Sequence, residues 1–207
     1  QALAAAFATL PREEVRTIAD AVPHVCRESV QTVEDEMEVT QGKLSMGFSC
    51  GSDDMPALLL GNTLFGGSSN SKLFLNVREK LSLCYYASSM YHRQKGIITV
   101  SSGIEFQNYQ RAYDEILSQL AAVQNGELEE WELAGARSTL LNSYATVGDS
   151  QGKLENFYLG QAATGRSETP ADLAQAVMEV SAERICRAMS MVKLDTVYFL
   201  KGKEAQA

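Results

Sequence analysis

The chain has 207 residues, of which 45% are apolar and 21% charged, so it can form one substantial hydrophobic core or two small ones, and one globular domain is the default expectation. Its 18 basic and 26 acidic residues give a net charge of −8 without any cluster of lysine and arginine, which argues against a nucleic-acid partner because phosphate neutralisation needs clustered cations. No apolar run reaches the roughly 18 residues of a membrane-spanning helix, so we expect no membrane partner either.

The first forty residues predict a helix followed by a connector. Residues 10–21 contain a proline near the first turn, then two glutamates and apolar residues at helical spacing, which is typical of a helix. Residues 27–41 are polar and acidic, and we expect them to form a connector. The chain also begins in what resembles the end of a helix rather than with methionine. We therefore interpret residues 1–40 as the tail of a preceding domain or a linker, and residues 41–207 as an α+β domain.

The middle of the chain predicts strands and short helices. Alternation of apolar with small or polar residues indicates a half-buried strand, and the helix after it is apolar all round and hence expected to be buried. After a second short helix, two strands form a hairpin through Lys95 and Gly96. In chain order, these elements are expected at residues 43–51 (strand), 55–65 (helix), 71–81 (helix), 84–93 (strand) and 96–105 (strand).

The second half of the chain predicts helices and one closing strand. Helical spacing places Ile116 and Leu120 on one buried stripe and Trp131 on another. The helices are expected at residues 107–124, 127–145 and 151–163, with two more that begin at Thr169 and Ser181, and the strand is expected at residues 195–202. Because strands come early and last, with helices grouped between them, we predict an α+β fold: an antiparallel sheet covered on one side by helices.

The histidines and cysteines do not form a metal-binding motif. His24 and His92 belong to no H-x-x-E-H arrangement, whereas a zinc hydrolase needs about three protein ligands and a nearby base. We interpret both histidines as exposed, and we expect no zinc or other cofactor in this chain. Without a C-x-x-C pair, reduced thiols in the cytoplasm are favoured over disulfides or a metal site. The cysteines are Cys26, Cys50, Cys84 and Cys186.

Two other features are interpreted as structural. The serines that follow residue 67 lack a G-x-S-x-G elbow and an obvious histidine base, which argues against a serine hydrolase. The acidic run GELEEWE, residues 126–132, is typical of an exposed helix start, where carboxylates favour the positive end of the helix dipole.

The segment FGGSSNSKLFLNVREKLSLCYY, residues 65–86, holds the remaining candidates. No G-K-[ST] follows Gly66 and Gly67, so we expect a tight turn between two helices with positive φ rather than a phosphate loop. Arg78 ends a helix and Tyr85 opens a strand, so the two can converge as a cationic fork and a phenolic donor suited to a carbonyl or an oxyanion. From the residues alone, a surface arginine and a tyrosine at the edge of the core remain the more frequent interpretation.

This segment resembles the glycine-rich turn and the R-x-K-x-x-L-x-Y sequence in the non-zinc halves of insulinase/pitrilysin-type metallopeptidases, which include the processing peptidases. The resemblance extends more loosely over residues 41–202. It implies two similar α+β halves that close as a clamshell, with an inverted H-x-x-E-H zinc site only in the other half. Residues 41–207 would then be a non-catalytic peptidase-like domain. The resemblance also implies that Arg78 and Tyr85 hold the substrate backbone near that zinc.

The resemblance leads to two hypotheses about function. In the first, the chain is a non-catalytic domain that completes a peptide-binding chamber opposite a zinc-bearing half, in the same polypeptide or in a partner subunit. In the second, it is a scaffold or protein-interaction subunit that kept the fold without any role in proteolysis. The chain departs from the frequent family sequence R-E-K-R-G-L-A-Y at Leu81, Ser82 and Cys84, but it keeps Arg78 and Tyr85.

Overall fold

One five-stranded sheet forms the base of the fold in a computed structural model that describes residues 2–11 and 28–203. Its strands are β1 (Gln31–Met37), β2 (Gly42–Cys50), β3 (Cys84–His92), β4 (Ile97–Ile104) and β5 (Val192–Gly202). The strand order is β1-β5-β2-β4-β3. β1 pairs with β5 in parallel, and the other neighbours pair antiparallel. The sheet is therefore mostly antiparallel, as predicted, with one parallel pair at an edge.

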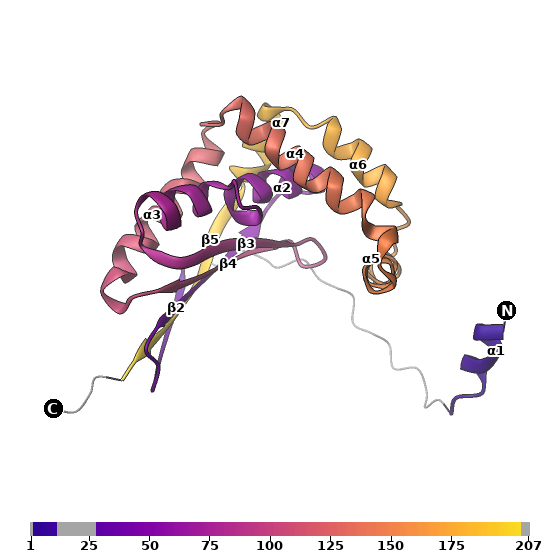
Figure 1. Ribbon diagram of the computed structural model, residues 1–207, viewed down its shortest axis with the longest axis horizontal. Helices are drawn as coiled ribbons and strands as arrows, with labels where there is room; N and C mark the ends of the chain where they lie inside the picture. The colour runs from indigo at the N-terminus through magenta and orange to yellow at the C-terminus, as the bar shows by residue number, and fades with distance from the viewer. Residues whose placement is uncertain (1, 12–27, 204–207) are drawn as a thin grey trace.

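Helices cover one side of this sheet. The α-helices are α1 (Ala2–Ala8), α2 (Met55–Asn62), α3 (Tyr109–Gln124), α4 (Glu130–Ala145), α5 (Gln151–Ala163), α6 (Pro170–Met178) and α7 (Ala182–Met189). Short segments between them are the π-helical η1 (Thr63–Gly67) and η2 (Leu73–Lys80) and the 3₁₀ turns η3 (Phe106–Asn108) and η4 (Val147–Asp149). In Figure 1, helices α2, α3, α4, α6 and α7 lie together on one side of the strands. The predicted α+β architecture is confirmed.

The hydrophobic core lies between the sheet and these helices. Five of its strand residues from the middle of the sheet are at most 1% exposed: Leu44, Met46 and Phe48 of β2, and Ile98 and Val100 of β4. They belong to one cluster with helix residues that include Leu58, Ile116, Ile185 and Met189. The period-2 pattern of the sequence therefore marks the buried face of the strands.

The opposite face of the sheet carries small hydroxyl side chains. Ser88 of β3 pairs with Ser101 of β4, which pairs with Ser45 of β2, and Ser45 in turn pairs with Tyr198 of β5. All four residues are exposed or half-buried. We call this surface the open face and define it by these four residues, Met90 and Thr99.

Strand β1 lies in the stretch that the sequence predicted as a connector, so that prediction is wrong. All side chains of β1 are exposed, and the strand is held by its pairing with β5. Lys201 of β5 places its Nζ 3.2 Å from a carboxylate oxygen of both Glu34 and Glu36. The acidic sequence is therefore that of a charged sheet edge rather than of a linker. From residue 12 onward, the helix predicted over residues 10–21 lies outside the described residues, and the division of the chain into two regions stays a prediction.

The buried stripes of two long helices were predicted with different success. On α3 the expected stripe is confirmed, since Ile116 and Leu120 are 0% and 5% exposed. On α4 it is wrong, because Trp131 is 54% exposed and the buried residues are Glu132 and Ala136. The face of α4 that packs inward thus contains a glutamate, which an apolar pattern cannot identify.

Two segments predicted as helices contain π-helical turns in the structure. The helix expected over residues 55–65 is α2 followed directly by η1, and the helix over residues 71–81 is the π-helical η2. The last strand begins at Val192, three residues before the predicted start.

Candidate functional site

The segment from α2 to β3 positions both predicted contact residues. Asp54 begins α2 by accepting a hydrogen bond from the Ala57 N–H at 3.3 Å. At the end of η2, the Leu81 N–H donates to the Asn76 carbonyl at 3.0 Å, a spacing of five residues that defines a π-type turn. Such turns are rare and are frequently found at functional sites. Here two of them, η1 and η2, flank the serine-rich turn.

Gly66 and Gly67 end η1, but the reason predicted for them is wrong, since neither has a positive φ. A Cβ atom on Gly66 would lie 2.7 Å from both the backbone N and the Oγ of Ser89, and 2.7 Å from Cδ1 of Leu73. Gly67 is less crowded, with its nearest neighbour, Nδ2 of Asn62, at 3.0 Å. Gly66 is therefore required by the close approach of η1 to β3.

Arg78 and Tyr85 lie next to each other. The Arg78 Nε donates to the Tyr85 carbonyl at 3.0 Å, and the guanidinium carbon lies 4.7 Å from the centre of the Phe74 ring. The only ion pair of Arg78 among the described residues joins Nη1 to the exposed Glu79 at 3.2 Å. The Tyr85 side chain is 57% exposed, and its hydroxyl donates to Glu105 at 3.4 Å, which is a long contact. The Nε bond and the ring contact thus orient the guanidinium without using all of its donors.

Two hollows meet at this pair. The larger one, about 840 Å³, is lined by Arg78, Tyr85, both glycines and the edge of the open face at Met90. The smaller one, about 470 Å³, is lined by Arg78, Tyr85 and Glu105. Both side chains therefore line open space that continues onto a hydroxyl-rich sheet surface.

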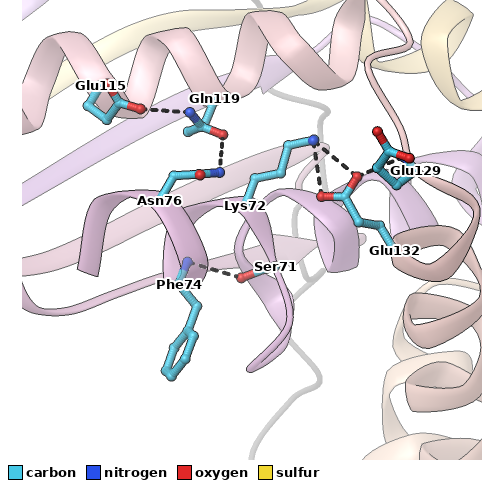
Figure 2. A network of polar contacts seen from close by, with 8 residues as sticks. All are labelled: Ser71, Lys72, Phe74, Asn76, Glu115, Gln119, Glu129 and Glu132. Carbon is cyan, nitrogen blue, oxygen red and sulfur yellow. Dashed lines mark hydrogen bonds and ion pairs between the residues drawn. The ribbon is translucent and has the colours of Figure 1, made fainter. Parts of the chain in front are cut away.

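A buried ion pair braces the segment that carries Arg78. Glu132 of α4 is 7% exposed, and each of its carboxylate oxygens lies 3.1 Å from Nζ of Lys72, which is 8% exposed (Figure 2). The same carboxylate accepts a hydrogen bond from the Glu129 N–H at 2.9 Å. Farther along η2, Asn76 donates to Gln119 of α3 at 2.8 Å. These bonds connect η2 to both long helices.

The prediction that the acidic run 126–132 is an exposed helix start is therefore wrong at Glu132. The sequence offered one signal, the E-x-x-E spacing of Glu129 and Glu132, which forms a capping box in which carboxylates bond backbone N–H groups. Nothing in that spacing identifies Lys72 as the partner.

Comparison with known proteins decides the family. Residues 2–140 match the sequence model of the peptidase M16 inactive domain. The chain belongs to this family. The resemblance to the non-zinc halves of insulinase/pitrilysin-type peptidases is thereby confirmed, and so is the assignment of the chain as an inactive peptidase domain.

Several relatives of this M16 inactive domain are longer proteins. It is 39% identical over 199 residues to "Probable inactive metalloprotease YmfF" of Bacillus subtilis, covering 93% of the chain and 47% of the relative. A second B. subtilis protein, "Uncharacterized zinc protease YmxG", is 23% identical over 72% of the chain and 38% of its own length. The crystal structure of a conserved protein from Enterococcus faecalis superposes with a TM-score of 0.83 at 28% identity, over 96% of the chain and 48% of that protein. The M16 inactive domain thus spans about half the length of these relatives or less.

The part of the M16 inactive domain that the structure describes holds no group of three or more histidine, cysteine and acidic side chains arranged for a metal ion. His92, predicted to be exposed, is half-buried because its Nε2 lies 3.0 Å from the Thr99 hydroxyl. His24 and Cys26 lie outside the described residues. Within the same described ranges, no helix is long and apolar enough to cross a membrane.

The described cysteines, Cys50, Cys84 and Cys186, are free thiols. Burial raises the pKa of the Cys50 thiol to about 12. Burial also raises the pKa of Cys84, against smaller lowering effects of a hydrogen bond with Ser102 and of the Arg78 charge. Neither thiol is activated, because the reactive form of cysteine is the thiolate.

Cys50 should react with iodoacetamide at pH 8 about tenfold to a hundredfold more slowly in the folded domain than in urea. A pKa of about 12 instead of 9.0 lowers the thiolate fraction roughly a thousandfold, and the higher nucleophilicity of a more basic thiolate offsets part of this. Alkylation rates measured by peptide mass spectrometry check the prediction. Equal rates in the two conditions would contradict it.

Proposed function

We propose that this M16 inactive domain completes a peptide-binding chamber opposite a zinc-bearing half, located in the same polypeptide or in a partner subunit. Within it, Arg78 and Tyr85 contact the backbone of a peptide substrate. The observation that carries the proposal is the hydrogen bond from the Arg78 Nε to the Tyr85 carbonyl, which orients the guanidinium beside two hollows and next to the open face.

The chemistry of the pair suits peptide carbonyl groups. A guanidinium is a donor only, and a protonated phenol can donate, so the pair complements an acceptor such as a carbonyl oxygen. The zinc of the other half would supply a nucleophilic water and polarise the scissile carbonyl. The residues of this chain would hold the peptide in register and stabilise negative charge as it develops on oxygen.

The open face supports the same assignment. Ser45, Ser88 and Ser101 lie side by side in register, and their small uncharged side chains leave room for a peptide without selecting a charge. One relative of the domain, YmxG, is named a zinc protease and has a length that leaves room for a second domain.

Arg78→Ala and Tyr85→Phe should each lower peptide turnover by about a hundredfold to a thousandfold in the full-length protein or complex that contains the zinc half. Removing one donor from a developing oxyanion costs about 2.7–4 kcal/mol in the transition state. Turnover of a peptide library, with the melting temperature recorded for each variant, checks the prediction.

Matched controls are Arg111→Ala on the exposed face of α3 and Tyr158→Phe on α5, which should leave turnover unchanged. Full activity of both site variants, in a preparation whose unmodified form cleaves peptides, would show that the substrate-contact role is wrong.

The scaffold hypothesis remains the second candidate, and the name of YmfF favours it. That relative, 39% identical to this chain, is named a "Probable inactive metalloprotease", which supports a role without proteolysis. If the half that accompanies this domain lacks the H-x-x-E-H ligands, the domain would serve association alone. In that case Arg78→Ala would leave all measured properties of the complex unchanged.

A cytoplasmic location is part of the proposal. It is supported by the three free thiols of the described residues, since disulfides accumulate in oxidising compartments.

A further inference from the structure

A third cavity lies at the far end of β3 from Tyr85. Its volume is about 650 Å³, within the range typical of small-molecule sites. Its walls are the β3–β4 hairpin, the loop between β2 and α2, and the chain that follows α5. In Figure 1 the tip of this hairpin lies beside α5. The cavity shares no lining residue with the two hollows at Arg78 and therefore does not belong to the site described above.

Arg93 of the hairpin lines this cavity without a carboxylate partner in the described residues. Its guanidinium carbon lies 5.6 Å from the centre of the Phe157 ring of α5, a cation–π contact. A Cβ atom on Gly160 would lie 3.6 Å from Nη2 of Arg93 and 3.1 Å from Nε2 of Gln94, so the hairpin packs closely against α5. An aromatic ring and a close-packed helix thus hold this cation, and no carboxylate of residues 2–11 or 28–203 forms an ion pair with it.

Arg166 lines the same cavity from the other side. Its ion pair with Glu168 is 3.5 Å long, and both side chains are substantially exposed, so the pair is weak. Asp53 is the only carboxylate among the lining residues, against two guanidinium groups. With Glu168 beside Arg166, two carboxylates accompany the two guanidinium groups, so the cavity lacks the acidic excess of a chain whose net charge is −8.

Tyr91 lines the same cavity and adds a neutral donor. Its hydroxyl has no hydrogen-bond partner in the described part of the chain. Burial raises the pKa of Tyr91 to about 12, while the charges of Arg166 and Arg93 both act to lower it. Both guanidinium groups therefore lie within electrostatic reach of one phenol that stays protonated at neutral pH.

From this geometry we infer that the cavity binds a small molecule through a carboxylate or phosphate group, held by Arg93 and Arg166 with the Tyr91 hydroxyl as a third donor. Planar guanidinium groups suit both kinds of oxyanion. This inference is independent of the proposed role of the domain in a peptide chamber.

Titration calorimetry on the full-length protein tests the inference, with inorganic phosphate and succinate as separate probes. At least one probe should bind saturably, at one site per chain, in buffer whose ionic strength is kept constant with sodium chloride. Tighter binding of phosphate or of succinate would identify which anion the cavity prefers. Arg93→Gln and Arg166→Gln should each weaken binding about tenfold or more, since each removes a charge-assisted donor.

The control Arg111→Gln removes an exposed arginine of α3 and should leave binding unchanged. Arg166→Gln does not disturb the ring contact of Arg93, so it keeps the test valid if the Arg93 variant folds poorly. The absence of saturable binding of both probes, or equal affinity in the Arg166→Gln and unmodified proteins, would overturn the inference.

Discussion

Replacing Glu132 by leucine should lower the free energy of unfolding by about 3–5 kcal/mol. The change leaves the Lys72 ammonium buried without the two carboxylate oxygens that now lie 3.1 Å from it. It also removes the acceptor of the Glu129 N–H, which adds the loss of a helix cap. Urea denaturation followed by circular dichroism measures the effect.

The double variant Lys72→Met with Glu132→Leu should recover most of this loss. Replacing both charges by apolar side chains of similar size removes the cost of an uncompensated buried charge. The remaining loss is the hydrogen bond from the Glu129 N–H that caps α4. Glu130→Leu, an exposed change in the same turn of α4, should alter stability by about 0.5 kcal/mol or less. If Glu132→Leu were no less stable than the control Glu130→Leu, the ion pair of Lys72 and Glu132 would be solvated rather than buried.

Phe65→Ala should destabilise the domain by about 3–5 kcal/mol, since a fully buried phenylalanine leaves a cavity when it is truncated. Phe65 of η1 is 0% exposed, and its ring meets that of Phe48 on β2 edge-to-face, with centroids 6.3 Å apart. At roughly 2–4 °C per kcal/mol for a chain of this size, the melting temperature should fall by about 6–20 °C.

Trp131→Ala is the matched control, because it removes a larger aromatic side chain that is 54% exposed. It should shift the melting temperature by only about 1–2 °C. If the two variants melted at the same temperature, the packing of η1 on the sheet would contribute little to stability.

Elements with strong local periodicity could be predicted from the sequence. The β2 strand alternates buried Leu44 and Met46 with smaller polar residues, and the α3 stripe of Ile116 and Leu120 recurs at helical spacing. Each pattern lies within one element, and a buried face imposes it directly on neighbouring residues. The motif that carries Arg78 and Tyr85 could be found for a similar reason, because both residues lie within eight consecutive positions of one segment.

Other features depend on partners that are distant in the sequence. The sequence of β1 was interpreted as a polar connector. Its strand conformation comes from pairing with β5, more than 160 positions later, and not from burial of its own side chains. Glu132 was predicted to be exposed because its partner Lys72 is 60 positions away in the sequence. His92 was misjudged although its contact Thr99 is only seven positions away, because that contact forms across the β3–β4 hairpin.

The sequence by itself determined the fold class, the family and the segment that carries the candidate contact residues, because these depend on local periodicity and on a contiguous motif. The tertiary structure alone decided which glutamate is buried, which edge strand completes the sheet, and that Gly66 is needed for close packing rather than for a positive φ. It also brought Arg93 and Arg166 to one cavity. In each case the physical reason is the same: desolvation, close approach and charge compensation are set by neighbours in space, and these neighbours are far apart along the chain.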